Sequence, residues 1–384
     1  MKEGWEYKKL GEVATYINGF PFKPSDWKEI GKPIIRIQNL TNPHGGFNRC
    51  SRNDIPEKYF VVKGDVLISW SATLGVFEWE SEDALLNQHI FKVVFDKADI
   101  DKHFFKYAVL MSITEMAKHT NGDTMKHIRK GDFDNIKIPY PSLSEQQSIV
   151  DYLDSAFAKI DAMKANAEKT LNEAKALFQA SLKEMLEPKE GWKEKKLGEV
   201  CEKITDGSHN PPKGVVKSEN LMLSSQNIQN DYLDMSNARY ISDEDFRKEN
   251  QRTSASKGDV LLTIVGTIGR TCVLKGTEGN ITFQRSVAVL KPSSNILSRF
   301  LMFFLLSQNS VLNTTAQGAA QKGIYLKQLG ILGIFYPPLS DQQSIVDTLD
   351  SLKSKVDRLK ANFEKISKEC DALKQALLKE VFER

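Results

Sequence analysis

Histidine and cysteine are the residue types in this chain that could bind a metal ion or act as a nucleophile. The histidines contain no i, i+4 pair, the spacing that places two ligands on one helix face; they are His44, His89, His103, His119, His127 and His209. The cysteines lie far apart and form no C-x-x-C pair; they are Cys50, Cys201, Cys272 and Cys370. We therefore expect neither a metal site nor a disulfide framework, and this cysteine usage fits a reducing cytoplasm.

Two other short patterns fall short of catalytic motifs. Asn210-Pro211-Pro212 is followed by Lys213, where an amino-methyltransferase needs an aromatic residue to stack on its target base. No glycine-rich cofactor loop precedes this segment. The sequence Gly-Thr-Ile-Gly at 266–269 is too short for a phosphate-binding loop and lacks the following Lys-Ser/Thr pair. We therefore expect no catalytic residues and no cofactor in this chain.

Polar and basic residues in loops remain as candidates for binding DNA. Asn and Gln can read adenine with two hydrogen bonds, Arg and Lys can read guanine, and hydroxyls and lysines suit phosphates. Any one of these residues alone is better explained as ordinary surface. The candidates are Lys23, Gln38, Asn39, Ser69, Ser71, Thr73, Gln88, His89, Lys126, His127, Arg129, His209, Lys213, Gln226, Asn227, Thr267, Arg270, Gln284, Arg285, Gln321, Lys322 and Tyr325.

These loops recur because the chain contains two copies of one sequence pattern. Gly-Trp-x4-Leu-Gly-Glu-Val occurs at 4–13 and 191–200, and Lys-Gly-Asp-Val-Leu at 63–67 and 257–261. Leu-Ser-Glu/Asp-Gln-Gln-Ser-Ile-Val-Asp occurs at 143–151 and 339–347. Two copies of about 190 residues fill the chain, and the second is longer, mostly between the first two of these motifs. Each copy is long enough to bury its own core.

Each copy begins with short β-type runs broken by Gly, Pro and Asn, with helical patches between them. The predicted strands include 33–37, 65–69, 90–95, 260–264 and 286–290, and the helical patches are 104–111 and 300–306. This mixture predicts an α+β domain of about 140 residues in each copy. The expected domains are 1–142 and 189–338.

Each copy ends in a long helix, at 143–188 and 339–384. Ser144 with Gln147, and Ser340 with Gln343, are predicted capping boxes at the helix starts. Apolar residues repeat at heptad spacing, which indicates a seam that needs a partner helix. The expected seam residues of the second helix are Ile345, Leu349, Leu352, Val356, Leu359, Phe363, Ile366, Cys370, Leu373 and Leu377. Those of the first are Leu153, Ala156, Ile160, Met163, Ala167, Leu171, Ala174 and Leu177. We expect the two helices to pair with each other in antiparallel orientation.

Composition restricts the class of protein. The chain has 384 residues, of which 40% are hydrophobic and 27% charged, with a net charge of +3, so wholesale disorder is excluded. The longest apolar run, at 300–306, is too short to span a membrane, and the N-terminus lacks the apolar core of a signal peptide. With so small a net charge, a DNA-binding role requires locally concentrated basic groups or partner subunits that hold the phosphates.

The three repeated motifs, in this order and over the full chain, make the sequence resemble the specificity subunit of type I restriction-modification systems. That resemblance implies two pseudo-symmetric α/β target recognition domains separated by an antiparallel two-helix coiled coil. It implies that each domain reads one half of a bipartite site in double-stranded DNA and that the helices set the gap. The implied partners are two modification subunits, which methylate adenine with S-adenosylmethionine, and restriction subunits where present. The resemblance implies no enzymatic activity in this chain.

A coiled-coil scaffold that binds only proteins is the main alternative, and an enzyme acting on nucleic acid is the third. A scaffold would confer no DNA sequence preference in any assembly, whereas an enzyme would turn over alone. The recognition loops differ between the copies, so an asymmetric target is expected, but its bases cannot be carried over from the family.

Overall fold

The computed structural model describes residues 5–42, 45–70, 74–119, 130–316 and 323–383. The chain divides into two compact units, each built from one globular domain and a stretch of both long helices. Unit 1 comprises Met1–Asn166 and Glu364–Arg384, and unit 2 comprises Ala167–Phe363. Each long helix therefore contributes to both units and does not form a separate domain. No described helix is long and apolar enough to cross a membrane.

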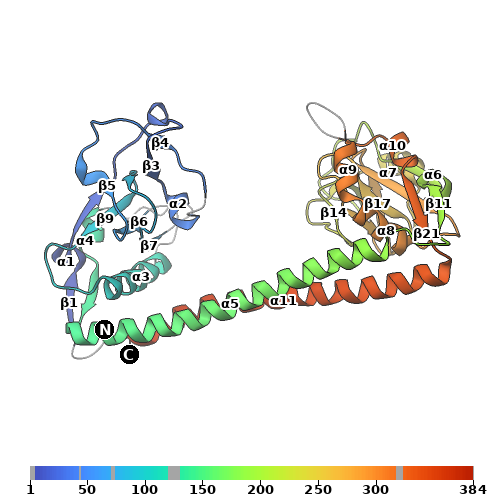
Figure 1. Cartoon of the computed structure of the whole chain (residues 1–384). Helices are drawn as coiled ribbons and strands as arrows, with labels where there is room; N and C mark the ends of the chain where they lie inside the picture. Colours follow the sequence, from blue (N-terminus) through green and yellow to red (C-terminus); the bar gives the residue numbers. More distant parts are fainter. Residues whose placement is uncertain (1–4, 43–44, 71–73, 120–129, 317–322, 384) are drawn as a thin grey trace. The chain divides into compact units, whose positions relative to one another are not determined.

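The globular domain of unit 1 contains two four-stranded sheets and a two-stranded one (Figure 1). The first sheet is antiparallel and has the order β2 (Thr15–Asn18), β9 (Ile90–Val94), β6 (Val66–Ser69) and β7 (Gly75–Glu78). The second has the order β4 (Arg49–Cys50), β3 (Lys32–Ile35), β8 (Ala84–Leu86) and β5 (Phe60–Val61), with β3 and β8 parallel. The third pairs β1 (Glu6–Lys9) with β10 (Lys137–Tyr140). The helices are α1 (Leu10–Val13), α2 (Ile37–Thr41), α3 (Lys102–His119) and α4 (Lys130–Asp134), with 3-10 turns at Pro24–Asp26 and Glu57–Tyr59.

Strand β6 lies between two layers, which explains why its four residues are all buried. Successive side chains of a strand point to opposite faces. Val66 and Ile68 therefore face Phe104 and Phe105 of α3, while Leu67 packs with residues of the second sheet. A strand buried on both faces appears in the sequence as an uninterrupted apolar run.

Unit 2 repeats this topology. Its first sheet has the order β12 (Cys201–Asp206), β20 (Val287–Pro292), β17 (Val260–Thr263) and β18 (Thr271–Val273). The second has the order β16 (Arg239–Ile241), β13 (Asn220–Leu223) and β19 (Asn280–Phe283), again with a parallel pair, β13 and β19. The two-stranded sheets are β11 (Lys193–Lys196) with β21 (Gly333–Tyr336), and β14 (Ile228–Gln229) with β15 (Tyr232–Leu233). The helices are α6 (Leu197–Val200), α7 (Asp243–Thr253), α8 (Ser298–Ser307), α9 (Asn309–Thr315) and α10 (Leu326–Gly330).

Helix α7 lies in the segment where the second copy is longer than the first. Ser242 caps it by accepting a hydrogen bond from the Asp245 amide at 3.1 Å, and three acidic residues occupy its first turn. Carboxylates at this end are favourable because the helix dipole is positive there. The first copy has only the short 3-10 turn Glu57–Tyr59 in the matching segment.

The long helices are α5 (Leu143–Met185) and α11 (Leu339–Glu383). In unit 1, Val150 and Leu153 from the start of α5 share a core with Leu378 from the end of α11. In unit 2, Phe178 from the end of α5 shares a core with Leu349 from the start of α11. The helices are therefore antiparallel within each unit, as Figure 1 shows. The predicted α+β fold, with two repeated domains and an antiparallel helix pair, is confirmed.

Three predicted seam residues are wrong. Met163, Leu177 and Leu373 are 59%, 58% and 48% exposed. The other predicted leucine, isoleucine, valine and phenylalanine positions of the seam are buried or half-buried. In the first helix, the half-buried Lys164 takes the place of the predicted Met163 and the buried Phe178 that of the predicted Leu177, whereas Leu171 is buried as predicted.

Lysines occupy two of the seam positions, which is why the apolar pattern missed them. Lys164 of α5 pairs with Asp371 at 3.2 Å, and Lys374 of α11 pairs with Asp161 at 2.6 Å. A lysine can lie along an apolar surface with its methylene chain and still hold its ammonium group in water. The two reciprocal pairs fix which turns of α5 and α11 meet in unit 1.

A buried glutamine fastens each globular domain to the start of its long helix. Gln146 accepts a hydrogen bond from the Asp101 amide and donates one to the Pro141 carbonyl. Gln342 accepts from the Leu297 amide and donates to the carbonyls of Pro337 and Asn295. These are the first glutamines of the repeated Gln-Gln pairs.

The predicted capping boxes at the starts of these helices are not formed. Gln147 and Gln343 instead bond carboxylates one turn later, and Ser142 caps the first helix, accepting from the Glu145 amide at 3.3 Å.

Candidate nucleic-acid interface

The loops predicted to bind DNA in unit 1 are joined by main-chain hydrogen bonds. After β2, the Phe20 amide donates to the Leu86 carbonyl at 2.8 Å, and the Gln88 amide donates back to the Phe20 carbonyl at 3.0 Å. The loop after β6 is bonded to these two segments through the Trp70 amide, which donates to the His89 carbonyl at 3.5 Å. Three segments that are far apart in the sequence thus form one loop cluster.

Unit 2 builds the same loop cluster. The Ser208 amide donates to the Phe283 carbonyl, and the Arg285 amide donates back to the Ser208 carbonyl, each at 2.8 Å. The Ile264 amide donates to the Ser286 carbonyl at 2.9 Å. A fourth segment enters here, because the Ile324 amide donates to the Ile264 carbonyl at 2.9 Å.

A glycine permits this close approach in each domain. A Cβ at Gly19 would lie 2.0 Å from the Asn87 carbonyl oxygen, and one at Gly207 would lie 2.0 Å from the Phe283 carbonyl oxygen. No side chain fits at either position without separating the loops.

The loop clusters leave many of the predicted side chains exposed. In unit 1, Lys23, Gln38 and Gln88 are exposed, and His89 is half-buried against Trp70 with 5.2 Å between ring centroids. In unit 2 the exposed or half-buried candidates are His209, Lys213, Gln226, Thr267, Arg270, Gln284, Arg285 and Tyr325. These residues remain candidates for contact with DNA.

Three predicted DNA-binding residues are buried and cannot read bases. Asn39 accepts from the Arg36 amide and donates to the Gly46 carbonyl seven residues on. Asn227 likewise accepts from the Ser224 amide and donates to the Asp234 carbonyl, again seven residues on. Ser69 is fully buried within β6. Both asparagines close their own loops, and only their repetition in the two copies could have indicated that role.

Seven other candidates lie outside the described residues: Ser71, Thr73, Lys126, His127, Arg129, Gln321 and Lys322.

A hollow of about 410 Å³ opens among the loops of unit 2. It brings together the predicted residues His209, Arg285 and Tyr325, and Tyr325 is 66% exposed. Another lining residue, Arg252 from the last turn of α7, is not among the residues predicted from the sequence. The hollow therefore combines two guanidinium groups, an imidazole and a phenol, a set suited to base edges and phosphates.

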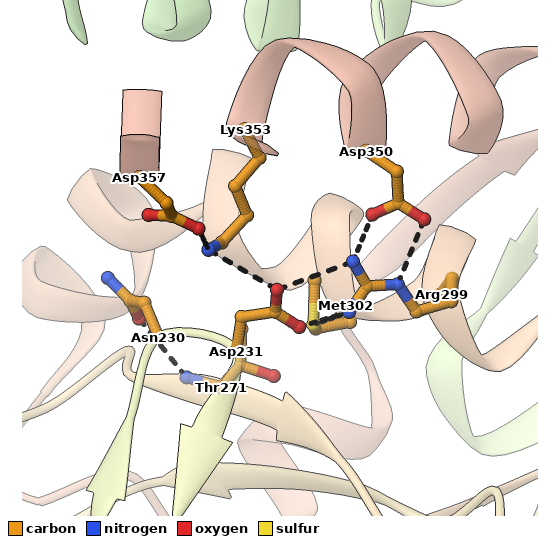
Figure 2. Close-up of polar contacts among 8 residues, drawn as sticks. All are labelled: Asn230, Asp231, Thr271, Arg299, Met302, Asp350, Lys353 and Asp357. Atoms are coloured by element: carbon orange, nitrogen blue, oxygen red, sulfur yellow. Dashed lines mark hydrogen bonds and ion pairs between the residues drawn. The ribbon is translucent and has the colours of Figure 1, made fainter. Parts of the chain in front are cut away.

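An ion cluster holds the globular domain of unit 2 on α11, as Figure 2 shows. Arg299 of α8 pairs with Asp231, in the turn between β14 and β15, and with Asp350 of α11. Lys353 of α11 pairs with Asp231 at 3.3 Å and with Asp357 at 2.6 Å. Burial alone would lower the pKa of Lys353, but the hydrogen bond to Asp357 and the charge of Asp231 raise it overall. The ammonium group is thus retained in the cluster.

A different ion cluster occupies this place in unit 1. Glu78 of β7 pairs with Lys102 at 2.7 Å and with Lys106 at 2.9 Å, both from α3. Burial by itself would raise the pKa of Glu78, but the two lysine hydrogen bonds outweigh it and lower that pKa to about 2. His103 lies 3.6 Å from Asp154 of α5 and 3.9 Å from Glu78.

The cysteine thiols are not exposed at these loops. All four cysteines are buried, and burial raises the pKa of the Cys201 and Cys272 thiols to about 12. Such thiols are protonated and poor nucleophiles at neutral pH. Among the described residues, no three His, Cys, Asp or Glu side chains gather in a way that could hold a metal ion.

Comparison with protein families gives a match over nearly the whole chain. The model described as "Type I restriction modification DNA specificity domain" matches residues 2–173 and 189–368, one match for each copy. The EcoBI specificity subunit of Escherichia coli is 26% identical over 100% of this chain and 86% of its own length. The EcoKI specificity subunit of Escherichia coli strain K12 is 24% identical over 100% of this chain and 89% of its own length.

Solved structures share the fold. A structure of a type I R-M system contains a chain with a TM-score of 0.74 and 20% identity, covering 100% of this chain and 98% of that one. The HsdS subunit of Thermoanaerobacter tengcongensis has a TM-score of 0.54 and 20% identity, covering 100% of this chain and 97% of that one.

Proposed function

Because this chain belongs to the type I restriction-modification DNA specificity family, we propose that each of its globular domains reads one half of an asymmetric bipartite DNA site. The observation that carries this proposal is the repeated loop cluster. The same main-chain bonds position the loops in both domains, while the side chains differ: Gln88 and His89 in unit 1 correspond to Arg285 and Ser286 in unit 2. Different side chains on one frame favour different half-sites.

The paired helices α5 and α11 set the gap between the half-sites and dock two adenine methyltransferase subunits. Two reading domains on one face of B-DNA need a separation near one helical turn, about 34 Å, or a multiple of it. A stiff helical pair can impose that phase, whereas a flexible linker could not.

Chemistry belongs to the partner subunits, which bind S-adenosylmethionine, and this chain supplies no catalytic residue. A net charge of +3 is consistent with partners that provide much of the phosphate contact. The chain alone should therefore bind DNA weakly, with a shallow dependence on salt.

The decisive test changes the exposed or half-buried loop residues of unit 2 in the assembled methyltransferase. Gln284 and Arg285 are both replaced by Ala, and methylated sites are mapped by genome-wide sequencing of modified bases. We expect altered specificity in one half-site only. If the wild-type complex methylates without any bipartite sequence preference, the proposal fails and a protein-only scaffold is favoured.

A second test removes one heptad from each long helix, at 161–167 and 364–370, and maps the sites again. A shorter gap, or loss of methylation because the domains are out of phase, supports the helices as the ruler. An unchanged gap would refute that role.

A further inference from the structure

The carboxylate of Asp206 organises the hollow of unit 2. Its side chain is 9% exposed, and its Oδ2 accepts a hydrogen bond from His209 Nε2 at 2.8 Å. Its Oδ1 accepts from Arg252 Nη2 and from Arg252 Nε, the latter at 3.2 Å. The Asp206 carbonyl accepts from the same Nε at 2.9 Å. One buried acid therefore holds two half-exposed side chains that line the hollow.

This arrangement leaves part of the Arg252 guanidinium available. Asp206 takes the edge formed by Nε and Nη2, and Nη1 has no protein acceptor in the described part of the chain. The side chain is 47% exposed and lines the hollow beside Arg285 and Tyr325. A guanidinium fixed along one edge presents its remaining N–H groups in a set direction, which reduces the entropy lost on binding.

A merely structural role for Arg252 is the competing explanation, because the ion pair also links α7 to β12. Other contacts already fasten that end of α7, however. Lys203 donates to the Arg252 carbonyl at 2.7 Å, and Lys291 donates to the Ser254 carbonyl at 2.9 Å. Neither contact uses the Arg252 side chain, so the helix end keeps two anchors when the guanidinium is removed.

The described residues of unit 1 contain no equivalent of this Asp206–Arg252–His209 arrangement. Asn18 stands where Asp206 does, Pro21 stands where His209 does, and α7 has no counterpart among the described residues of the first domain. Any base preference created by Arg252 should therefore belong to one half-site.

We propose that Arg252, oriented by Asp206, reads a guanine in the half-site bound by unit 2. A guanidinium that donates two parallel hydrogen bonds matches the O6 and N7 acceptors of guanine in the major groove. Asp206 is then a positioning residue, and His209, held by the same carboxylate, lies beside the base that Arg252 contacts. This inference rests on the proposed function and adds a specific base and the residue that reads it.

The test uses the methyltransferase assembled on the full chain, with short duplexes in which each base pair of the half-site is replaced in turn. Arg252→Ala should lose about ten- to a hundred-fold of discrimination at one G·C pair and leave the other half-site unchanged. Arg252→Lys should lose nearly as much, because lysine keeps the charge but not the planar fork. Asp206→Asn should weaken the same preference by a smaller factor. The control is Arg247→Ala, an exposed arginine on the same helix.

Unchanged discrimination in both Arg252 variants, or a loss spread evenly over all positions, would overturn the inference and leave the proposed function standing. If Arg252→Ala abolishes methylation through misfolding, the discrimination of Arg252→Lys at the same G·C pair decides between the two explanations. Absence of any base preference in the wild-type half-site would instead count against the proposed function itself.

Discussion

The two units hold their globular domains on the long helices with different charges at matching positions. His103 in unit 1 corresponds to Arg299 in unit 2, and each faces an aspartate of the long helix, Asp154 or Asp350. Arginine is always charged and can bond two carboxylates at once, whereas histidine forms an ion pair only when protonated. The buried glutamines Gln146 and Gln342, in contrast, make matching hydrogen bonds in the two units. The comparison separates what the fold requires from what each copy can vary.

The largest expected effects come from the shared glutamines. Gln342→Ala leaves one amide and two carbonyls without their partner, and we expect a loss of about 3 kcal/mol in local stability. Gln146→Ala leaves one amide and one carbonyl, and should lose about 2 kcal/mol. Hydrogen-exchange mass spectrometry on the full chain would measure each domain separately. Gln343→Ala and Gln147→Ala are exposed neighbours and serve as controls; equal effects in buried and exposed variants would contradict the anchoring role.

Breaking the charged contacts should affect the two units unequally. Arg299→Ala leaves Asp231 and Asp350 facing each other with only Lys353 to compensate, and should lower the opening free energy of α8 by about 2 kcal/mol. His103→Ala should change that of α3 by less than about 0.5 kcal/mol, because its pairs are long and half-exposed. Exchange rates of the α8 and α3 amides would give both values. Similar losses in the two units would remove the distinction between them.

Acid should weaken the Glu78 cluster of unit 1. The folded pKa of Glu78, about 2, lies below the ordinary 4.5. Its contribution is therefore complete above pH 4.5 and is lost as the pH falls toward 2. We expect amide protection of β7 and α3 to fall as the pH is lowered from 4.5 toward 2, by about 1 kcal/mol. Glu78→Gln should flatten this part of the pH dependence, and an undiminished slope in that variant would exclude Glu78 as its source.

The smallest effects are expected at the exposed leucine and methionine positions of the long helices. Met163→Ala, Leu177→Ala and Leu373→Ala should each change stability by no more than about 0.5 kcal/mol. Ile160→Ala, at a buried position of unit 1, should lose about 2–4 kcal/mol. Urea denaturation of the full-length variants would compare them. A large loss of stability in Met163→Ala would show that Met163 is a seam residue, as the apolar pattern predicts.

The sequence predicted the architecture well because repetition and periodicity are local signals. The predicted strand at 65–69 is β6 at Val66–Ser69, and the apolar patch at 300–306 lies within α8. Heptad spacing of apolar residues located both long helices. It missed the half-buried lysines between them, because lysine is not counted as an apolar residue. Lys164 and Lys374 fill seam positions with their methylene chains, a use of lysine that hydrophobicity alone does not reveal.

Candidate site residues were harder to predict, because adjacent polar residues can have opposite fates. Gln38 is exposed and Asn39 beside it is buried, and Gln226 and Asn227 repeat this difference. Arg252 could not be assigned at all, since the packing of α7 against β12, β13 and β19 is what brings it to the hollow. Sequence reasoning identified the loop segments, whereas tertiary packing brings them together and decides which of their side chains remain available.

The loop clusters have a consequence for how such a protein acquires a new target. Their fastening groups are amides and carbonyls, which residues of nearly every type possess. Side chains at positions such as Gln88 or Arg285 can therefore be exchanged without disturbing the scaffold beneath them. The exceptions are any side chain at Gly19 or Gly207, where no Cβ fits, and proline at an amide-donor position such as Phe20, Gln88, Ser208 or Arg285, where it would delete an N–H. Apart from those exceptions, point substitutions can retune recognition while the fold stays intact.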